Sequence, residues 1–155
     1  MGVKKGITVS DAKKKIQHYC AYQERCHQEV IIKLKELGMI QDVIDNIVTD
    51  LIKNNYLNET RFAESFTRGK FNIKKWGKLK ILRELKKREI SEYNIKIGMK
   101  EISDSDYKET FNELFEKKSA ELSHLSKSDQ KRKIFNYLSY KGWEVEKIFD
   151  ALRKI

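Results

Sequence analysis

The sequence predicts an all-α protein made of three tandem three-helix repeats in an elongated arrangement. Two observations indicate this fold class. The chain of 155 residues contains no proline and only seven glycines, so it lacks the turn residues of an all-β protein, while its many lysine, glutamate, leucine and isoleucine residues favour helices. One pattern of apolar positions also occurs three times along the chain, as in repeat architectures.

The three copies of this pattern are separated by 51 and 53 residues. The aligned apolar sets are Leu34, Leu85 and Leu138; Val30, Ile81 and Ile134; Ile31, Leu82 and Phe135; Met39, Ile90 and Trp143; Ile44, Ile95 and Ile148; and Val48, Met99 and Leu152. Gly38 and Gly142 match at a turn, where glycine permits left-handed backbone, and Glu89 takes this place in the middle copy.

The register divides the chain into a flexible basic tail and three repeats. The tail is 1–9, and the repeats are 10–57, 58–103 and 104–155. Ser10, Ser91 and Ser126 are predicted N-caps, because a serine side chain accepts a hydrogen bond from an amide of the first helical turn. In the second and third repeats the predicted helices are 59–75, 77–88, 92–101, 105–122, 129–141 and 144–154.

The composition argues against several classes of protein. No apolar run approaches the length of a membrane span and no apolar signal core follows the N-terminus, so we expect a soluble, cytoplasmic protein that binds no membrane. Cys20 and Cys26 would point about 240° apart on one helix, which is unsuited to a disulfide. His27 follows Cys26, but a second pair of ligands is lacking, so we expect no metal and no other cofactor.

Positive charge is concentrated in the middle of the chain. Between Arg68 and Arg88 there are ten basic residues and one acidic residue, Glu84, which gives a net charge of +9, against +10 for the whole protein. Such a local excess predicts a basic surface whose partner is a polyanion. The alternative is that these residues only solvate the helices, but a solvated face normally mixes charges of both signs.

Helical spacing separates the buried and exposed sides of this basic region. The predicted apolar stripes are Phe62, Phe66 and Ile73 on the first helix and Ile81, Leu82 and Leu85 on the second, with Phe71 outside the stripe. The candidate contacts to a partner are Arg61, Arg68, Lys70, Lys74, Lys75, Trp76, Lys78, Lys80, Arg83 and Lys87. Basic residues beside an aromatic ring can neutralise phosphates and stack on a base. In the last repeat, the predicted packing residues are Tyr137, Tyr140 and Trp143, although Tyr140 lies off the apolar stripe of its helix.

Catalysis has little support in the sequence. Gly69 and Gly77 stand alone and form no phosphate-binding loop. A nuclease would need clustered carboxylates to hold metal ions, and the basic region has almost none. No serine, histidine and aspartate are arranged as a catalytic site requires, so we assign no catalytic residue and expect no enzyme.

Two stretches of the chain resemble a known family. The run Leu57–Glu64 contains the motif residues Asn58, Glu59, Arg61, Phe62 and Ala63. Together with Tyr137–Trp143 and the repeat register, this run is similar to the RecX proteins, bacterial regulators of the RecA recombinase. Asn58 replaces the first of two acidic residues usual in the family, and we expect it to cap the helix in that residue's place. Tyr140 and Lys141 stand where the family often has paired arginines before glycine.

The resemblance implies a curved, all-helical modulator that lies in the deep groove of the RecA filament and also contacts single- or double-stranded DNA weakly. It would act as a monomer and inhibit filament extension, ATP hydrolysis and strand exchange, and so modulate recombination and DNA repair. Two other hypotheses stay open. One is a free-standing DNA-binding protein whose repeats act as helix-turn-helix modules, and the other is an enzyme acting on nucleic acid.

Overall fold

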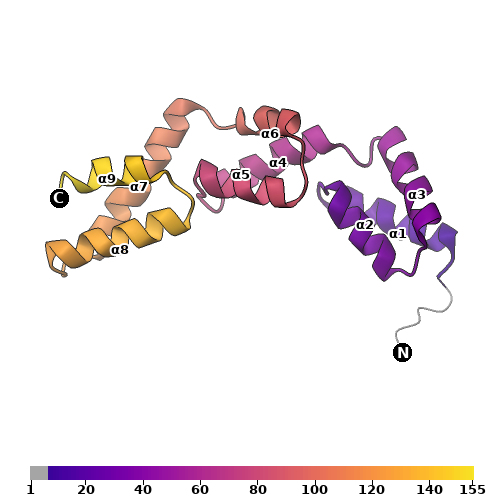
Figure 1. Cartoon of the computed structure of the whole chain (residues 1–155), viewed down its shortest axis with the longest axis horizontal. Coiled ribbons are helices and arrows are strands. Elements are labelled where there is room, and N and C mark those ends of the chain that lie inside the picture. Colours follow the sequence, from indigo (N-terminus) through magenta and orange to yellow (C-terminus); the bar gives the residue numbers. More distant parts are fainter. Residues whose placement is uncertain (1–6) are drawn as a thin grey trace. The chain divides into compact units, whose positions relative to one another are not determined.

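Nine helices and no strands make up residues 7–155, the part of the chain that the computed structural model describes (Figure 1). They are α1 (Val9–Tyr22), α2 (His27–Glu36), α3 (Gln41–Lys53), α4 (Glu59–Asn72), α5 (Lys78–Lys87), α6 (Glu92–Met99), α7 (Asp104–Glu121), α8 (Lys127–Tyr140) and α9 (Val145–Leu152). The all-α class and the succession of three-helix repeats are confirmed. None of these helices has both the length and the apolar composition of a membrane span.

The chain divides into two compact units, and the division falls within the middle repeat. Unit 1 contains the chain up to Phe66 together with Arg88–Gly98, and unit 2 contains Thr67–Lys87 and Met99–Ile155. Helix α4 therefore contributes its first part to unit 1 and its second part to unit 2. The three repeat boundaries read from the register, and the elongated, curved arrangement, stay predictions.

The first helix begins earlier than predicted. Thr8 caps α1, because its Oγ1 accepts a hydrogen bond of 3.0 Å from the amide of Asp11. The prediction of Ser10 as the cap is wrong. Thr8 and Ser10 both have side chains that can cap a helix, but only Thr8 lies three residues before Asp11, whose amide it accepts from. Of the predicted basic tail, residues 1–6 lie outside the described residues, and Val9 is already helical.

The other two predicted serine caps are confirmed. Ser91 Oγ accepts a hydrogen bond of 3.2 Å from the amide of Asn94, and Ser126 Oγ accepts one of 3.2 Å from the amide of Asp129. Each serine satisfies an amide that has no partner within the helix. The start of a helix was therefore predictable where only one residue able to cap it stood three positions before the amide to be satisfied.

The turns at corresponding places in the three repeats share a left-handed backbone. The φ angle is +83° at Gly38, +61° at Glu89 and +93° at Gly142. Glutamate adopts this conformation at a cost, because its Cβ crowds the neighbouring backbone. The middle repeat thus keeps the turn geometry of its neighbours without the residue best suited to it, which supports the register independently of the apolar pattern.

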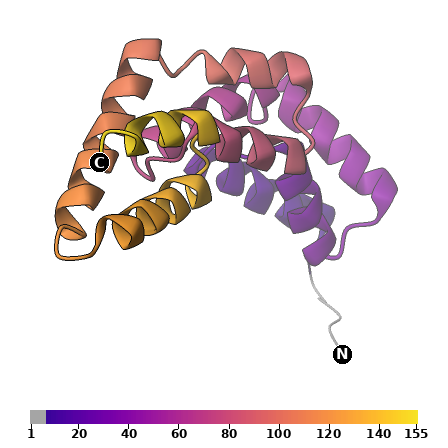
Figure 2. The same ribbon diagram turned by 60° about the vertical axis from the view of Figure 1, so that its left-hand side comes forward.

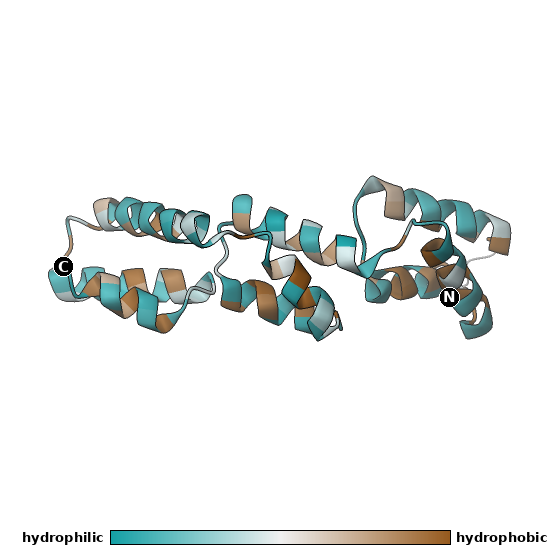
Figure 3. Ribbon diagram, turned by 90° about the horizontal axis from the view of Figure 1, so that it is seen from above, coloured by the Kyte–Doolittle hydropathy of each residue, from teal (hydrophilic) through white to brown (hydrophobic). Residues whose placement is uncertain are grey.

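The aligned apolar sets of Leu34, Val30 and Ile44 are buried in all three repeats, whereas the set of Ile31 is half-buried in all three. The leucines Leu34, Leu85 and Leu138 are fully enclosed. In Figure 3 the hydrophobic positions alternate with hydrophilic ones along each helix, so each helix buries one side. The core of the first three helices consists of Ile16, Cys20, Val30, Leu34, Ile44, Ile47, Leu51 and Leu57.

Two assignments around the end of α4 are wrong. Ile73, predicted to be buried, has 77% of its surface exposed, whereas Phe71, predicted to lie outside the apolar stripe, has 5% exposed. The regular helix ends at Asn72, and Lys75 is left-handed with a φ of +59°. Ile73 therefore lies beyond the helix, where helical spacing cannot predict which side its side chain faces. Phe71 is covered by α7, whose Tyr107 ring lies 6.0 Å away between centroids. On α5, Ile81 and Leu85 are buried as predicted, but Leu82 is only half-buried.

The last three helices pack around one tryptophan. Helix α8 packs against both α7 and α9 (Figure 2). Trp143, at the turn between α8 and α9, is 1% exposed. Its ring stacks on Tyr107 at 4.4 Å and lies 5.4 Å from Phe111. The prediction that Trp143 packs in the core is confirmed, and its aromatic neighbours on α7 fix the position of the turn that bears it.

Candidate polyanion-binding site

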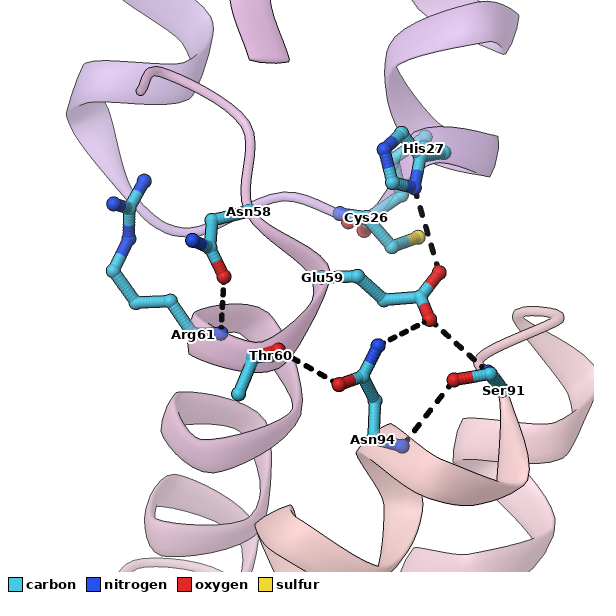
Figure 4. A network of polar contacts seen from close by, with 9 residues as sticks. Cys26, His27, Asn58, Glu59, Thr60, Arg61, Ser91 and Asn94 are labelled. Carbon is cyan, nitrogen blue, oxygen red and sulfur yellow. Dashed lines mark hydrogen bonds and ion pairs between the residues drawn. The ribbon is translucent and has the colours of Figure 1, made fainter. Parts of the chain in front are cut away.

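The predicted motif lies at the start of α4, in unit 1, where one carboxylate joins three helix starts (Figure 4). Glu59 Oε2 accepts hydrogen bonds of 2.7 Å from Asn94 Nδ2 and 3.1 Å from the amide of Ser91. Its Oε1 lies 3.5 Å from Nδ1 of His27. Glu59 therefore connects the first residues of α2, α4 and α6, which helical periodicity could not have revealed.

Arg61 is held by contacts inside unit 1. Its Nε lies 2.6 Å from Oε2 of Glu24, and its two terminal nitrogens donate to the side-chain and main-chain oxygens of Asn55 at 3.1 and 3.0 Å. Its amide donates to Asn58 Oδ1 at 2.8 Å, which confirms Asn58 as the helix cap. Four hydrogen bonds fix this arginine, so the structure places its guanidinium in the joint between the first two repeats.

The two apolar residues of the motif serve packing. Phe62 and Ala63 are buried. Gly98 on α6 lies so close to α4 that a Cβ built on it would be 2.8 Å from the main-chain oxygen of Ala63. The small side chain of Ala63 and the missing side chain of Gly98 allow this close approach. The motif therefore fixes the geometry of unit 1.

We expect Glu59→Gln to destabilise unit 1 by about 1 kcal/mol at pH 7, because a charged acceptor is replaced by a neutral one. Burial raises the pKa of the Glu59 carboxyl, but the hydrogen bonds from Asn94 and Ser91 and the nearby His27 outweigh it, so the pKa is lowered from 4.5. The ionised form therefore stabilises the fold above pH 4.5, and this contribution is lost as pH falls through the lowered pKa.

Urea unfolding of both proteins between pH 7 and pH 3 measures this difference. The stability gap between wild type and Glu59→Gln should narrow below pH 4.5. Glu36→Gln, on the exposed side of α2, is the control and should change stability at pH 7 by less than about 0.5 kcal/mol. A gap that stays constant down to pH 3 would exclude the charge of Glu59 as the cause.

The other nine predicted contact residues all belong to the Thr67–Lys87 segment of unit 2. The structure does not gather all of them. Arg68 forms an ion pair of 2.7 Å with Glu101, and Lys78 Nζ lies 4.5 Å from the centre of the Tyr107 ring. Arg83 and Lys87 are exposed on later turns of α5. Arg68 and Lys78 therefore contact Glu101 and Tyr107, while Arg83 and Lys87 share an exposed face of α5.

A smaller group of basic and aromatic side chains does converge. Lys80 Nζ lies 4.6 Å from the centre of the Trp76 ring and 4.4 Å from that of Tyr140. Lys70 Nζ lies 5.0 Å from the Trp76 ring. The prediction that Tyr140 packs in the core is wrong, because 77% of its surface is exposed. Two aromatic rings therefore flank one ammonium group, within cation–π distance of both.

Two further lysines complete this group. Lys141 Nζ donates a hydrogen bond of 2.7 Å to the main-chain oxygen of Lys74. Burial lowers the pKa of Lys141, and the charges of Lys80 and Lys74 lower it further. No ion pair among the described residues includes Lys74, Lys80 or Lys141. We refer to Lys70, Lys74, Trp76, Lys80, Tyr140 and Lys141 as the basic aromatic cluster.

Main-chain contacts hold the two halves of the cluster together. The amide of Gly77 donates to the oxygen of Lys141 at 2.8 Å, and the amide of Leu79 donates to the oxygen of Gly142 at 3.0 Å. Trp143 Nε1 donates to the oxygen of Lys75 at 3.1 Å. The start of α5 is thereby fixed against the turn between α8 and α9. The half-buried Lys75 joins the site through its main chain.

Sequence reasoning missed Tyr140 and Lys141 as members of the site. Two signals could have found them: Tyr140 lies off the apolar stripe of its helix, and both residues occupy the positions where a paired arginine motif was expected. Their proximity to Lys74 and Lys80 arises from a contact between residues 67 positions apart. No local pattern encodes that contact.

The cluster can bind an anion but has no visible means of catalysis. The four lysine ammonium groups of the cluster can neutralise phosphates, and the exposed Tyr140 ring offers a surface for stacking. Within residues 7–155, no group of three or more histidine, cysteine, aspartate or glutamate side chains is placed to hold a metal ion. Burial raises the pKa of the thiols of Cys20 and Cys26 to about 11, so they are poor nucleophiles near pH 7.

Fold and site together define a helical repeat protein with a basic, aromatic surface. The model of the second three-helix domain of RecX matches residues 58–99. A regulatory protein RecX from Pelodictyon phaeoclathratiforme is 32% identical over 121 residues, covering 78% of this chain and 74% of the relative. The chain belongs to the RecX family.

Other relatives agree over most of the chain. A regulatory protein RecX from Geobacillus sp. strain WCH70 is 29% identical over 92% of this chain, which spans 54% of that relative, so the chain covers about half the length of several curated relatives. The crystal structure of RecX from Lactobacillus salivarius has a TM-score of 0.78 at 28% identity and covers 95% of this chain and 97% of that one. A second RecX crystal structure, at 19% identity, has a TM-score of 0.81 and supports the fold.

Proposed function

We propose that this chain binds the groove of the RecA nucleoprotein filament and inhibits filament extension, ATP hydrolysis and strand exchange. Membership of a family of regulatory proteins supports this proposal. Acting on RecA, the protein would modulate recombination and DNA repair in the cytoplasm. It would bind as a monomer and would not catalyse a reaction of its own.

The observation that carries the proposal is the basic aromatic cluster. Burial, and then the charges of Lys80 and Lys74, lower the pKa of Lys141. The lysines of the cluster therefore repel one another, and an anionic partner would relieve this repulsion. A filament that contains both DNA phosphates and acidic protein surface is such a partner. The aromatic rings of Trp76 and Tyr140 add contact area without adding flexible side chains.

Arg61 takes a different role in this proposal from that of the cluster lysines. Because its guanidinium is held by Glu24 and Asn55, we assign it to positioning the motif rather than to binding the partner. Arg68, Lys78, Arg83 and Lys87 remain candidates for peripheral contacts, which would steer association more than they add affinity.

We expect that adding the protein to RecA filaments on single-stranded DNA will lower the rate of ATP hydrolysis. A coupled ATPase assay at rising protein concentration measures the effect. Turnover that is unchanged at several-fold excess over the filament would exclude the proposal. Incubation of labelled DNA with the protein and Mg²⁺ should give no cleavage product, because the cluster lacks carboxylates that could hold a metal ion.

The alternative function is DNA binding without RecA, which the same cluster favours through its lysines. It predicts tight binding of the isolated protein to DNA at physiological salt. The affinity would then fall steeply with salt concentration, with a logarithmic slope of about 0.7 per neutralised phosphate on single strands. Weak DNA binding in fluorescence anisotropy, together with strong inhibition of RecA, would separate the two functions.

A further inference from the structure

A groove between α8 and α9 in unit 2 is lined by apolar and basic side chains, and its volume is about 450 Å³. We call its apolar lining residues, Phe135, Phe149 and Leu152, the floor. We call its basic lining residues, Lys131, Arg132 and Arg153, the rim. The two helices pack against each other, so the groove is a feature of the third repeat alone. None of its residues belongs to the basic aromatic cluster.

The floor exposes apolar surface on a protein otherwise rich in charge. Phe149 has 48% of its surface exposed. Its ring stacks on that of Phe135, with centroids 5.2 Å apart and planes inclined by 17°. One face of each ring is therefore already covered by the other, and Leu152 adds an aliphatic side chain. Such a floor suits an inserted apolar side chain better than a stacked nucleic-acid base.

Two of the three rim cations are held in exposed ion pairs that a partner can replace. Arg132 lies 3.2 Å from Asp129, and Arg153 is paired with Asp150, each three residues away on the surface. Exposed pairs of this kind contribute about 0–1 kcal/mol, so carboxylates of a bound partner can replace them at little cost. The segment 127–133 has four basic residues and one acidic residue, which makes this side of the groove electropositive.

We propose that this groove binds an acidic, amphipathic segment of a partner protein. An apolar side chain of that segment would cover Phe149 and Leu152, and its carboxylates would contact the arginines of the rim. Charge complementarity selects an acidic partner, and the exposed apolar side chain of Phe149 selects an amphipathic peptide. Binding here does not depend on the RecA function, since it uses a different surface and a different class of contact.

A synthetic peptide can test the groove directly. The probes are three helical peptides with glutamate at most positions and leucine, phenylalanine or methionine at every third or fourth position. They are titrated into the ¹⁵N-labelled protein, and the amide signals of Phe135, Phe149 and Leu152 are followed. We expect at least one peptide to shift these signals with a Kd below about 1 mM. Its serine-substituted and lysine-substituted versions should bind at least about tenfold more weakly.

Variants identify the contacts. Phe149→Ser should weaken binding about tenfold, and the double variant Arg132→Glu with Arg153→Glu should do so by a similar factor without touching the core. Tyr93→Ser on α6, a residue 73% exposed in unit 1, is the matched control and should leave affinity unchanged. The proposal is overturned if no peptide binds below about 1 mM. It is also overturned if the serine versions bind equally well, or if a single-stranded oligonucleotide shifts the groove signals more than every peptide does.

Discussion

Replacing Gly142 by alanine should destabilise unit 2 by about 3 kcal/mol or more. A Cβ at this position would lie 2.3 Å from Cβ and 2.5 Å from the main-chain nitrogen of Lys80, and the φ of +93° is itself unfavourable for alanine. The obstacle is the backbone of α5, which cannot move without breaking the hydrogen bonds that Gly77 and Leu79 donate to this turn. The free energy of unfolding in urea, followed by circular dichroism, measures the loss.

Gly38→Ala is the matched control for this prediction. Gly38 has a similar φ of +83°, but nothing lies within 4 Å of the position that its Cβ would occupy. Alanine there should cost about 1 kcal/mol, the price of the left-handed conformation alone. Glu89 at the corresponding turn has a φ of +61°, which shows that a side chain can be tolerated in the left-handed region. Equal losses for the two variants would mean that the close approach at Gly142 is unimportant.

Reversing the charges of Lys74, Lys80 and Lys141 to glutamate should abolish inhibition of RecA. We expect the protein concentration for half-inhibition to rise at least about tenfold, since losing about 1.4 kcal/mol of binding free energy has that effect and three attractive contacts become repulsive. The measurement is the ATPase assay with RecA on single-stranded DNA. Circular dichroism must first show that the helix content of the variant is intact.

The control for charge reversal is a triple variant in unit 1 that changes the net charge by the same amount. Lys14, Lys35 and Lys53 are exposed there, and their replacement by glutamate should leave inhibition within about twofold of wild type. A second comparison is the triple variant of Lys80, Arg83 and Lys87, which lie on one face of α5. If that variant loses as much RecA inhibition as the cluster variant, the whole face of α5 contributes to binding. If the cluster variant inhibits fully, the cluster is not the contact surface.

Much of the fold could be predicted because it depends on local rules. The apolar register identified Leu34, Leu85 and Leu138, which are fully buried, and the cap residues Asn58, Ser91 and Ser126 followed from side-chain chemistry and spacing. These rules involve residues within about one helical turn of each other. They failed where a helix ended sooner than expected, as at Ile73, because the spacing of a regular helix no longer applied.

The candidate site was predictable only in part. The concentration of charge located the basic region, but it could not distinguish a lysine directed toward the cluster from an arginine used in packing. Arg61 shows this limit, since the same guanidinium could bind a phosphate or the carboxylate of Glu24. Which of these partners it meets depends on how the first two repeats pack in unit 1.

The sequence by itself determined an all-α repeat protein, most of its core positions, most of its helix starts and a central excess of positive charge. The tertiary structure decided that Lys80 lies between Trp76 and Tyr140, and that Lys141 joins Lys74 across 67 positions of the chain. The physical reason is the range of the interactions. Periodicity and capping depend on neighbours along the helix, whereas the cluster exists only because glycines at the start of α5 and at the turn before α9 let two backbones meet.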